Sequence, residues 1–230
     1  MPDKEKRSIT RSFLRLLASV LAGLVLFSIL QVAVIRFINP PATPLMAYHW
    51  LGGESLDFRW RSLPEISPFL QTAVIAAEDQ RFPNHRGFDL EEVRKALQEY
   101  RKEGRRRGAS TITMQVAKNL YLWHGHSWLR KGLEVYYTAL IEFLWPKWRI
   151  LEVYLNVAEW GPEIFGAEAA SRRYFGCSAS ELTRAQAALL AAVLPNPLRW
   201  SPLHPTPYIR ERQFTILYQM DWFEPIQKPN

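Results

Sequence analysis

The chain has 230 residues, of which 48% are hydrophobic and 22% are charged. These proportions exclude disorder throughout, and the length leaves room for one domain and an appendage. The formal net charge of +7 indicates an anionic partner such as nucleic acid, anionic lipid or a phosphorylated substrate, and the single cysteine, Cys177, excludes an internal disulfide.

An uncharged apolar run, Leu16–Ile35, dominates the N-terminal region. As a helix its 20 residues span about 30 Å, the thickness of a bilayer's hydrocarbon core, so we expect a transmembrane helix over residues 16–36. Five basic residues precede the run and one follows it, which predicts a cytoplasmic N-terminus and a domain on the other side. A cleavable signal peptide is the alternative, but no small-residue cleavage site follows the run.

The anchor divides the chain into four expected parts. Residues 1–15 form a basic cytoplasmic tail, residues 16–36 span the membrane, and the prolines of residues 37–47 predict an extended stalk. Residues 48–230 form the folded domain.

Helical patterns dominate that domain, which we expect to be one all-α unit. Helix starts are indicated by caps at Ser67, Asp89 and Ser127, and by capping boxes at Ser178 and Thr183. Further helices are expected over residues 113–120, 147–158, 165–174 and 208–220. The basic, glycine-containing residues 101–108 predict a loop, and residues 47–61 are the best candidate for a hairpin or irregular cover.

A polar segment begins where the first of these helices ends, at Glu78 and Asp79. Glu78 is expected at the lip of the core, where partial shielding raises the pKa of a carboxyl toward neutrality, as a general base requires. Asp79 acts in the same direction if the two carboxylates lie close together. The alternative is a solvated helix end with a capping turn.

A second polar segment places Ser110 and Thr111 at the start of the helix over residues 113–120. Hydroxyls, backbone N–H groups and the helix dipole can hold an anion there, although either residue could simply be the helix cap. Gln115 and Lys118 are three residues apart and share one helix face. A lysine directed at an anion site favours phosphate.

The third segment contains Arg130, Lys131 and Glu134. Arg130 and Glu134 could form an ordinary surface ion pair. A glycoside hydrolase needs one carboxylic acid and a second carboxylate, whereas a transferase that expels pyrophosphate needs one base and several cations or a divalent metal. The basic residues that accompany Glu78 therefore favour glycosyl transfer from a sugar pyrophosphate.

Four motifs in order carry a family resemblance. They are Glu78-Asp79-x-x-Phe82-x-x-His85-x-Gly87-x-Asp89, Gly108-x-Ser110-Thr111-Ile112-Thr113-x-Gln115-x-x-Lys118-Asn119, Arg130-Lys131-x-x-Glu134 and Lys147-x-x-Ile150-Leu151-Glu152-x-Tyr154-Leu155-Asn156. Over about residues 48–218 the chain resembles the monofunctional biosynthetic peptidoglycan transglycosylases, relatives of the glycosyltransferase domain of class A penicillin-binding proteins. The resemblance implies a lysozyme-like, two-lobed α fold with one lobe that dips into the membrane.

The resemblance also implies the reaction and the roles of the site residues. Glycan strands are polymerised from lipid II by inverting transfer, which forms β-1,4 links and releases undecaprenyl pyrophosphate. Glu78 and Glu134 are the implied catalytic residues, Glu78 as the base for the acceptor's 4-hydroxyl and Glu134 near the pyrophosphate or its metal. The implied substrate-binding residues are Asp79, Ser110, Thr111, Gln115, Lys118, Arg130 and Lys131. The implied supporting residues are Phe82, His85 and Asn156.

The implied cofactor is a divalent cation, Mg²⁺ or Mn²⁺, whose ligands the sequence does not assign. The implied location is the bacterial inner membrane, with a single span and a periplasmic or otherwise extracytoplasmic catalytic domain. The expected partners are lipid II, the growing lipid-linked strand, the membrane and other cell-wall synthesis proteins, but not nucleic acid.

Two residues depart from the family pattern. Met114 stands where a second glutamine is common, and His126 stands where a basic residue is common. Because histidine is mostly neutral at pH 7, phosphate binding at His126 is expected to be weaker or pH-sensitive.

Two other functions remain open. One is a lysozyme-like lytic transglycosylase that cuts existing glycan, and the other is an inactive membrane-anchored scaffold.

Overall fold

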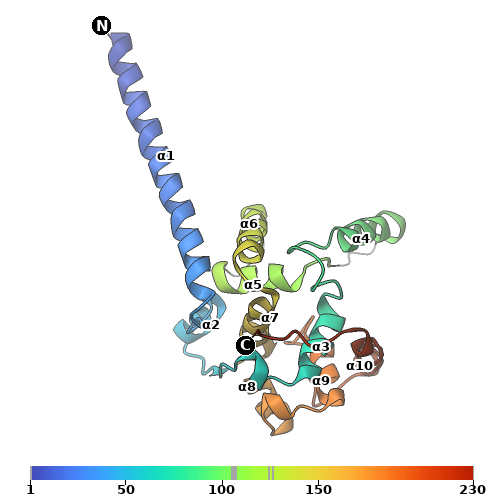
Figure 1. Ribbon diagram of the computed structural model, residues 1–230. Helices are drawn as coiled ribbons and strands as arrows, with labels where there is room; N and C mark the ends of the chain where they lie inside the picture. Colours follow the sequence, from blue (N-terminus) through green and yellow to red (C-terminus); the bar gives the residue numbers. More distant parts are fainter. Residues whose placement is uncertain (1, 105–107, 124, 126, 230) are drawn as a thin grey trace. The chain divides into compact units, whose positions relative to one another are not determined.

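The computed structural model describes residues 2–104, 108–123, 125 and 127–229. The chain divides into two units, Met1–Ile38 and Asn39–Asn230 (Figure 1). The first unit consists mainly of helix α1 (Pro2–Ile35), whose segment Arg11–Ile35 is long and apolar enough to cross a membrane. The expected span is therefore part of a longer helix that also includes most of the predicted tail.

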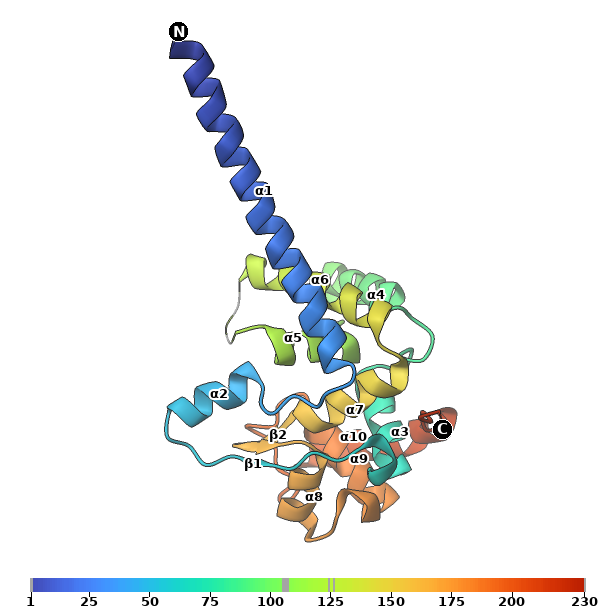
Figure 2. The ribbon, with the colours of Figure 1, turned by 60° about the vertical axis from the view of Figure 1, so that its left-hand side comes forward.

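Helices of the second unit pack in two groups, one on each side of α7 (Figures 1 and 2). One group contains α3 (Pro68–Glu78), α9 (Arg184–Val193) and α10 (Pro207–Gln219). The other contains α5 (Ile112–Tyr121) and α6 (Trp128–Leu144), and α5 also packs on α7 (Lys147–Val157). The all-α prediction is thus confirmed for the bulk of the domain.

The core helix α9 contacts both α3 and α10. Its N-terminus is closed by a capping box in which the Thr183 hydroxyl accepts a hydrogen bond from Gln186 N–H, and the Gln186 side chain accepts one from Thr183 N–H. Four buried alanines in α9 leave room for the neighbouring helices to approach closely.

The remaining elements surround these helices. They are α2 (Pro44–Leu51), α4 (Leu90–Glu103), α8 (Ala167–Phe175), η1 (Leu63–Glu65), η2 (Ala179–Glu181), η3 (Met220–Trp222), β1 (Asp57–Phe58), β2 (Glu159–Gly161) and β3 (Ile164–Phe165). The three short strands form one sheet in the order β1-β3-β2, with β1 parallel and β2 antiparallel to β3.

The predicted caps are where the sequence placed them. Helix α3 begins directly after Ser67, and Asp89 accepts hydrogen bonds from two backbone N–H groups at the start of α4. Ser127 accepts one from Arg130 N–H at the start of α6. The Ser178 box is also formed, where it starts the short helix η2.

The extended stalk over residues 37–47 is wrong at its C-terminal end. Helix α2 begins at Pro44, because proline suits the first turn of a helix and the Thr43 hydroxyl accepts a hydrogen bond from Met46 N–H at 3.2 Å. The buried Met46 side chain fixes this helix to the domain.

Three further expectations need correction. The loop over residues 101–108 begins later, because α4 continues to Glu103 and ends at the left-handed Gly104, while residues 105–107 lie outside the described part. Of the two alternatives for residues 47–61, the hairpin is wrong, since β1 pairs with the distant β3. Phe165 belongs to β3 rather than to a helix, and α8 starts only after Gly166.

Candidate active site

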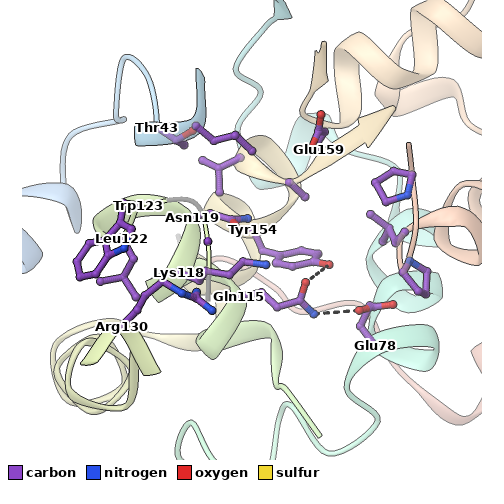
Figure 3. A pocket seen from close by; sticks show the side chains of 17 residues that line it. Thr43, Glu78, Gln115, Lys118, Asn119, Leu122, Trp123, Arg130, Tyr154 and Glu159 are labelled. Carbon is purple, nitrogen blue, oxygen red and sulfur yellow. Dashed lines mark hydrogen bonds between the residues drawn. The ribbon is translucent and has the colours of Figure 1, made fainter. Parts of the chain in front are cut away.

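A cavity of about 440 Å³ lies between the two helix groups of the domain. Its walls come mainly from the C-terminal end of α3, one face of α5, the C-terminal half of α7 with the start of β2, and the proline-containing segment after α9. In Figure 3, Glu78 enters from α3 on one side, and Lys118 and Arg130 lie on the α5–α6 side. The cavity therefore brings together residues from three of the four motifs and includes Tyr154 of the fourth.

Glu78 is the last residue of α3, whose preceding residues are buried in the core. Its side chain is 12% exposed and accepts a hydrogen bond of 2.9 Å from the Gln115 amide. The Tyr154 hydroxyl lies 3.4 Å from the Gln115 carbonyl oxygen and donates to it, which orients the amide so that its N–H faces Glu78 (Figure 3). The carboxylate is thus held at the edge of the cavity by elements α5 and α7.

Burial raises the pKa of Glu78 above its ordinary value, and the charge of Asp79 acts in the same direction. The hydrogen bond from Gln115 and the charges of Arg212 and Lys118 oppose this rise. A carboxylate with a raised pKa that remains partly stabilised as the anion has the properties of a general base.

Asp79 and Thr111 are scaffold residues in this structure. The buried Asp79 carboxylate accepts hydrogen bonds from His85 Nε2 at 2.8 Å and from Ile112 N–H at 2.9 Å. Thr111 caps α5 and donates to Gly87 O at 2.7 Å. Neither residue lines the cavity, so the structure does not bring these two predicted substrate-binding residues to the ligand space.

The loop between α3 and α4 packs on the start of α7. Phe82 is fully buried, and the Lys147 ammonium lies 4.5 Å from the centroid of its ring. Lys147 also pairs with Glu142, which accepts a second hydrogen bond from Thr113. Phe82 and His85 therefore fix the loop that directly follows Glu78.

Asn156 supports the site from a greater distance. Its buried side chain accepts a hydrogen bond from Arg61 N–H and donates one to Arg61 O, both at 2.8 Å. This pair of bonds fixes the extended segment after β1 against α7.

The third motif forms a partly buried charge cluster on α6. Glu134 is paired with Lys131 at 2.5 Å and with Arg130 at 3.6 Å, and the Arg130 and Glu134 side chains are 10% and 5% exposed. The alternative of an ordinary surface pair is therefore wrong. Arg130 lines the cavity, whereas neither Lys131 nor the predicted catalytic Glu134 does; these two residues pair with each other behind Arg130.

Lys118 lies on the cavity side of α5, exposed to the cavity but flanked by other charges. Desolvation lowers the pKa of its amine, Glu134 opposes this effect, and Arg130 and Lys131 lower the pKa further. The cluster thus carries more positive than negative charge, which favours an anionic ligand.

The donor set fits a divalent cation only in part. Among the described residues, no group of three or more His, Cys, Asp and Glu side chains converges. Glu134 is the acidic member of the basic cluster and could share a cation with phosphate oxygens of a ligand, as Mg²⁺ sites commonly do. The residues present therefore fit a cation held jointly with a substrate, and not one held by the protein alone.

Ser110 and the two departures from the family pattern have different surroundings. Ser110 is exposed at the start of α5 and does not line the cavity. Met114 is buried in the core, so the missing glutamine does not remove a polar group from the cavity lining. His126 lies outside the described residues.

Two charged residues near the site were not predicted from the sequence. Glu159 of β2 lines the cavity, and burial raises the pKa of its carboxyl. Arg212 of α10 lies 3.7 Å from Glu78. A pattern could have identified Arg212, since it shares a helix face with the buried residues Ile209 and Ile216 at spacings of three and four.

Comparisons with known proteins place the chain in a family. A family model described as Transglycosylase matches residues 47–221. A Pseudomonas aeruginosa protein named biosynthetic peptidoglycan transglycosylase is 50% identical over 216 residues, which cover 91% of this chain and 93% of the relative. A Rhodospirillum centenum protein of the same name is 53% identical over 214 residues, which cover 93% of each chain.

Proposed function

Because the chain belongs to the transglycosylase family and is a peptidoglycan glycosyltransferase, we propose that it polymerises lipid II with Glu78 as the general base. The single observation that carries the proposal is the position of Glu78 in one cavity with Lys118 and Arg130. One base opposite a cationic wall is the arrangement that expulsion of a pyrophosphate requires.

In the proposed reaction, Glu78 takes the proton from the 4-hydroxyl of the acceptor sugar. The hydroxyl oxygen then forms a bond to C1 of the lipid-linked growing strand from the face opposite the leaving group. The bond between C1 and the phosphate oxygen breaks, and undecaprenyl pyrophosphate leaves with the electron pair. The product is a β-1,4 link formed with inversion, and the proton remains on Glu78.

The cationic wall stabilises the leaving group. Lys118 and Arg130 face the cavity and neutralise the charge that develops on the pyrophosphate. Glu134 holds Arg130 and Lys131 by ion pairs, so that the two cations keep their positions before the substrate binds. Glu134 therefore contributes to leaving-group binding without accepting a proton from the acceptor.

We include a divalent cation, Mg²⁺ or Mn²⁺, in the proposal. Glu134 together with the pyrophosphate oxygens would hold it, and the bound cation would supply further neutralisation of the leaving group. Lys118 and Arg130 already provide positive charge at this wall, and Lys131 adds to it from behind, so we expect the cation to assist the reaction rather than to create the site.

The apolar helix Arg11–Ile35 is consistent with a single-pass membrane anchor. We propose that the N-terminus is cytoplasmic and that the catalytic domain lies on the periplasmic side of the inner membrane, as the basic residues before the span favour. Both substrates carry long lipid tails, and an anchored domain meets them at a high local concentration.

The test is polymerisation of purified lipid II by the full-length protein in detergent, with Glu78→Gln as the variant and Glu211→Gln, an exposed carboxylate on α10, as the control. We expect Glu78→Gln to remove polymer formation while the control keeps it. A folded Glu78→Gln variant that still polymerises would contradict the assignment of the base. Addition of a chelator should lower the rate, and an unchanged rate would remove the divalent cation from the proposal.

The other two functions have distinct signatures. Incubation with isolated sacculi should release no soluble fragments, and release would favour the lytic transglycosylase. Inactivity of the wild type on every glycan substrate would favour the scaffold.

A further inference from the structure

Arg212 connects the C-terminal helix to the catalytic base. It lies on the face of α10 that packs on α3 and α9, and its side chain is 27% exposed. Its Nη2 atom donates a hydrogen bond of 3.2 Å to Ala77 O and lies 3.7 Å from the Glu78 Oε1 atom. One guanidinium nitrogen thus contacts both the last turn of α3 and the carboxylate that follows it.

The contacts of Arg212 are few for a residue with five N–H donors. Its Nε atom is buried and has no hydrogen-bond partner among the described residues. The side chain is only partly shielded, but a buried donor on a cationic group without a hydrogen bond is costly unless the charge interacts with another group. The nearby anion is Glu78, so the charge of Arg212 has a specific recipient.

Several groups surround Glu78. Asp79 follows it in the chain, Lys118 faces it from α5, and the Tyr154 hydroxyl approaches it from α7 through Gln115. Of the two cations that lower the pKa of Glu78, Arg212 has the larger effect and Lys118 the smaller.

Arg212 and Lys118 also differ in their access to substrate. Lys118 lines the cavity, whereas Arg212 does not. A pyrophosphate in the cavity offsets the charge of Lys118, so its influence on Glu78 falls when the donor binds. Arg212 lies behind the carboxylate and keeps its influence throughout the reaction.

We propose that Arg212 is a positioning residue that keeps the Glu78 carboxylate charged and directed into the cavity while the donor pyrophosphate is bound. This inference rests on the proposed role of Glu78 as the general base. It places the C-terminal helix, which contributes nothing to the cavity lining, among the elements that set the activity of the enzyme.

The test is the pH dependence of kcat/KM for lipid II polymerisation by the full-length protein between pH 5.5 and 9. Arg212→Gln and Arg212→Met remove the charge, Arg212→Lys keeps it, and Arg210→Gln removes an exposed charge from the same helix as the control. An opposite charge within about 4–6 Å lowers a carboxyl pKa by roughly one to three units. We therefore expect the acid limb to move up by about one unit in both neutral variants, which is a loss of about tenfold on the acid side and little loss at high pH.

Arg212→Lys and Arg210→Gln should keep the acid limb of the wild type. A uniform loss at every pH in the neutral variants, or an acid limb that does not move, would overturn the inference and leave Arg212 a packing residue. An acid limb that moves as far in Arg212→Lys as in Arg212→Gln would also overturn it. Thermal unfolding of each variant shows which neutral substitution retains the fold and therefore carries the test.

Failure of this inference is separable from failure of the proposed function. If Glu78→Gln is inactive and the Arg212 profiles do not move, only the role of Arg212 is wrong. If Glu78→Gln still polymerises, both proposals are wrong.

Discussion

Substitution of Gly166 by alanine should destabilise the catalytic domain more than substitution of any exposed turn glycine. Gly166 has φ +85° and ψ 156°, a conformation that is essentially restricted to glycine. A Cβ atom there would lie 2.7 Å from Asn156 O, a backbone atom that cannot rotate away. The Gly166 N–H also donates to Ala158 O at 3.0 Å, so the residue is held against the end of α7 on both sides.

Two costs add at this position. The backbone conformation costs about 1–3 kcal/mol for a residue other than glycine. The steric contact costs about 1–3 kcal/mol more, as overpacking in a closed site usually does. Gly176 provides the comparison, since its φ of +71° is also positive, but with ψ 11° it lies in the left-handed helical region, and a Cβ atom there would meet nothing within 4 Å. Gly176→Ala should therefore cost only about 1–2 kcal/mol.

The assay is denaturant and thermal unfolding of the full-length variants in detergent, followed by the emission of the nine tryptophans. For a domain of this size, 1 kcal/mol shifts Tm by about 2–4 °C. We expect Gly166→Ala to melt at least about 5 °C below Gly176→Ala. Equal stability of the two variants would refute this reasoning, because both the backbone conformation of Gly166 and the contact with Asn156 O should make Gly166→Ala the more costly substitution.

Two further predictions concern charged residues. Burial would raise the pKa of Glu168, but hydrogen bonds from Arg61, Ala179 N–H and Arg172 lower it to about 2. Because this pKa lies below the ordinary 4.5, the ionised Glu168 carboxylate stabilises the fold above pH 4.5, and this stabilisation is lost as the pH falls toward 2. In urea unfolding, Glu168→Gln should therefore be less stable than the wild type at pH 7, and the difference should shrink as the pH falls from 4.5 toward 2. Lys118→Met should lower kcat/KM for lipid II by about 10²–10³ without change in Tm, and an equal loss in Lys118→Arg would show that shape rather than charge is needed.

Local signals in the sequence predicted the helices well. Asp89, Ser127 and Thr183 each cap a helix by bonding to backbone N–H groups two or three residues later, so a short stretch of sequence contains all the information. The sheet was missed for the opposite reason. Asp57 of β1 pairs with Ile164 of β3, and neither two-residue strand has a pattern of its own.

The candidate site shows the same contrast between what local sequence signals reveal and what depends on long-range contacts. The sequence identified the polar residues, but it could not separate those that face the cavity from those that build its frame. Asp79 and Gln115 are both polar and both belong to motifs, yet Asp79 is turned into the scaffold and Gln115 into the cavity. The helix pattern could place Arg212 on the buried face of α10, but it could not show that the side chain meets Glu78, which lies more than 130 residues earlier in the chain.

The distribution of charge around the cavity supports the proposal that Glu78 acts as a base beside a substrate rich in negative charge. A pyrophosphate near Glu78 would raise its pKa and favour the protonated, inactive form. The basic residues of α5 and α6 would neutralise that charge on one wall of the cavity, and ion pairs with Glu134 hold Arg130 and Lys131 in place. Gln115 and Arg212 stabilise the Glu78 anion from the other directions. In the proposed mechanism, the base and the leaving-group site can therefore share one small cavity because each has its own set of counter-charges.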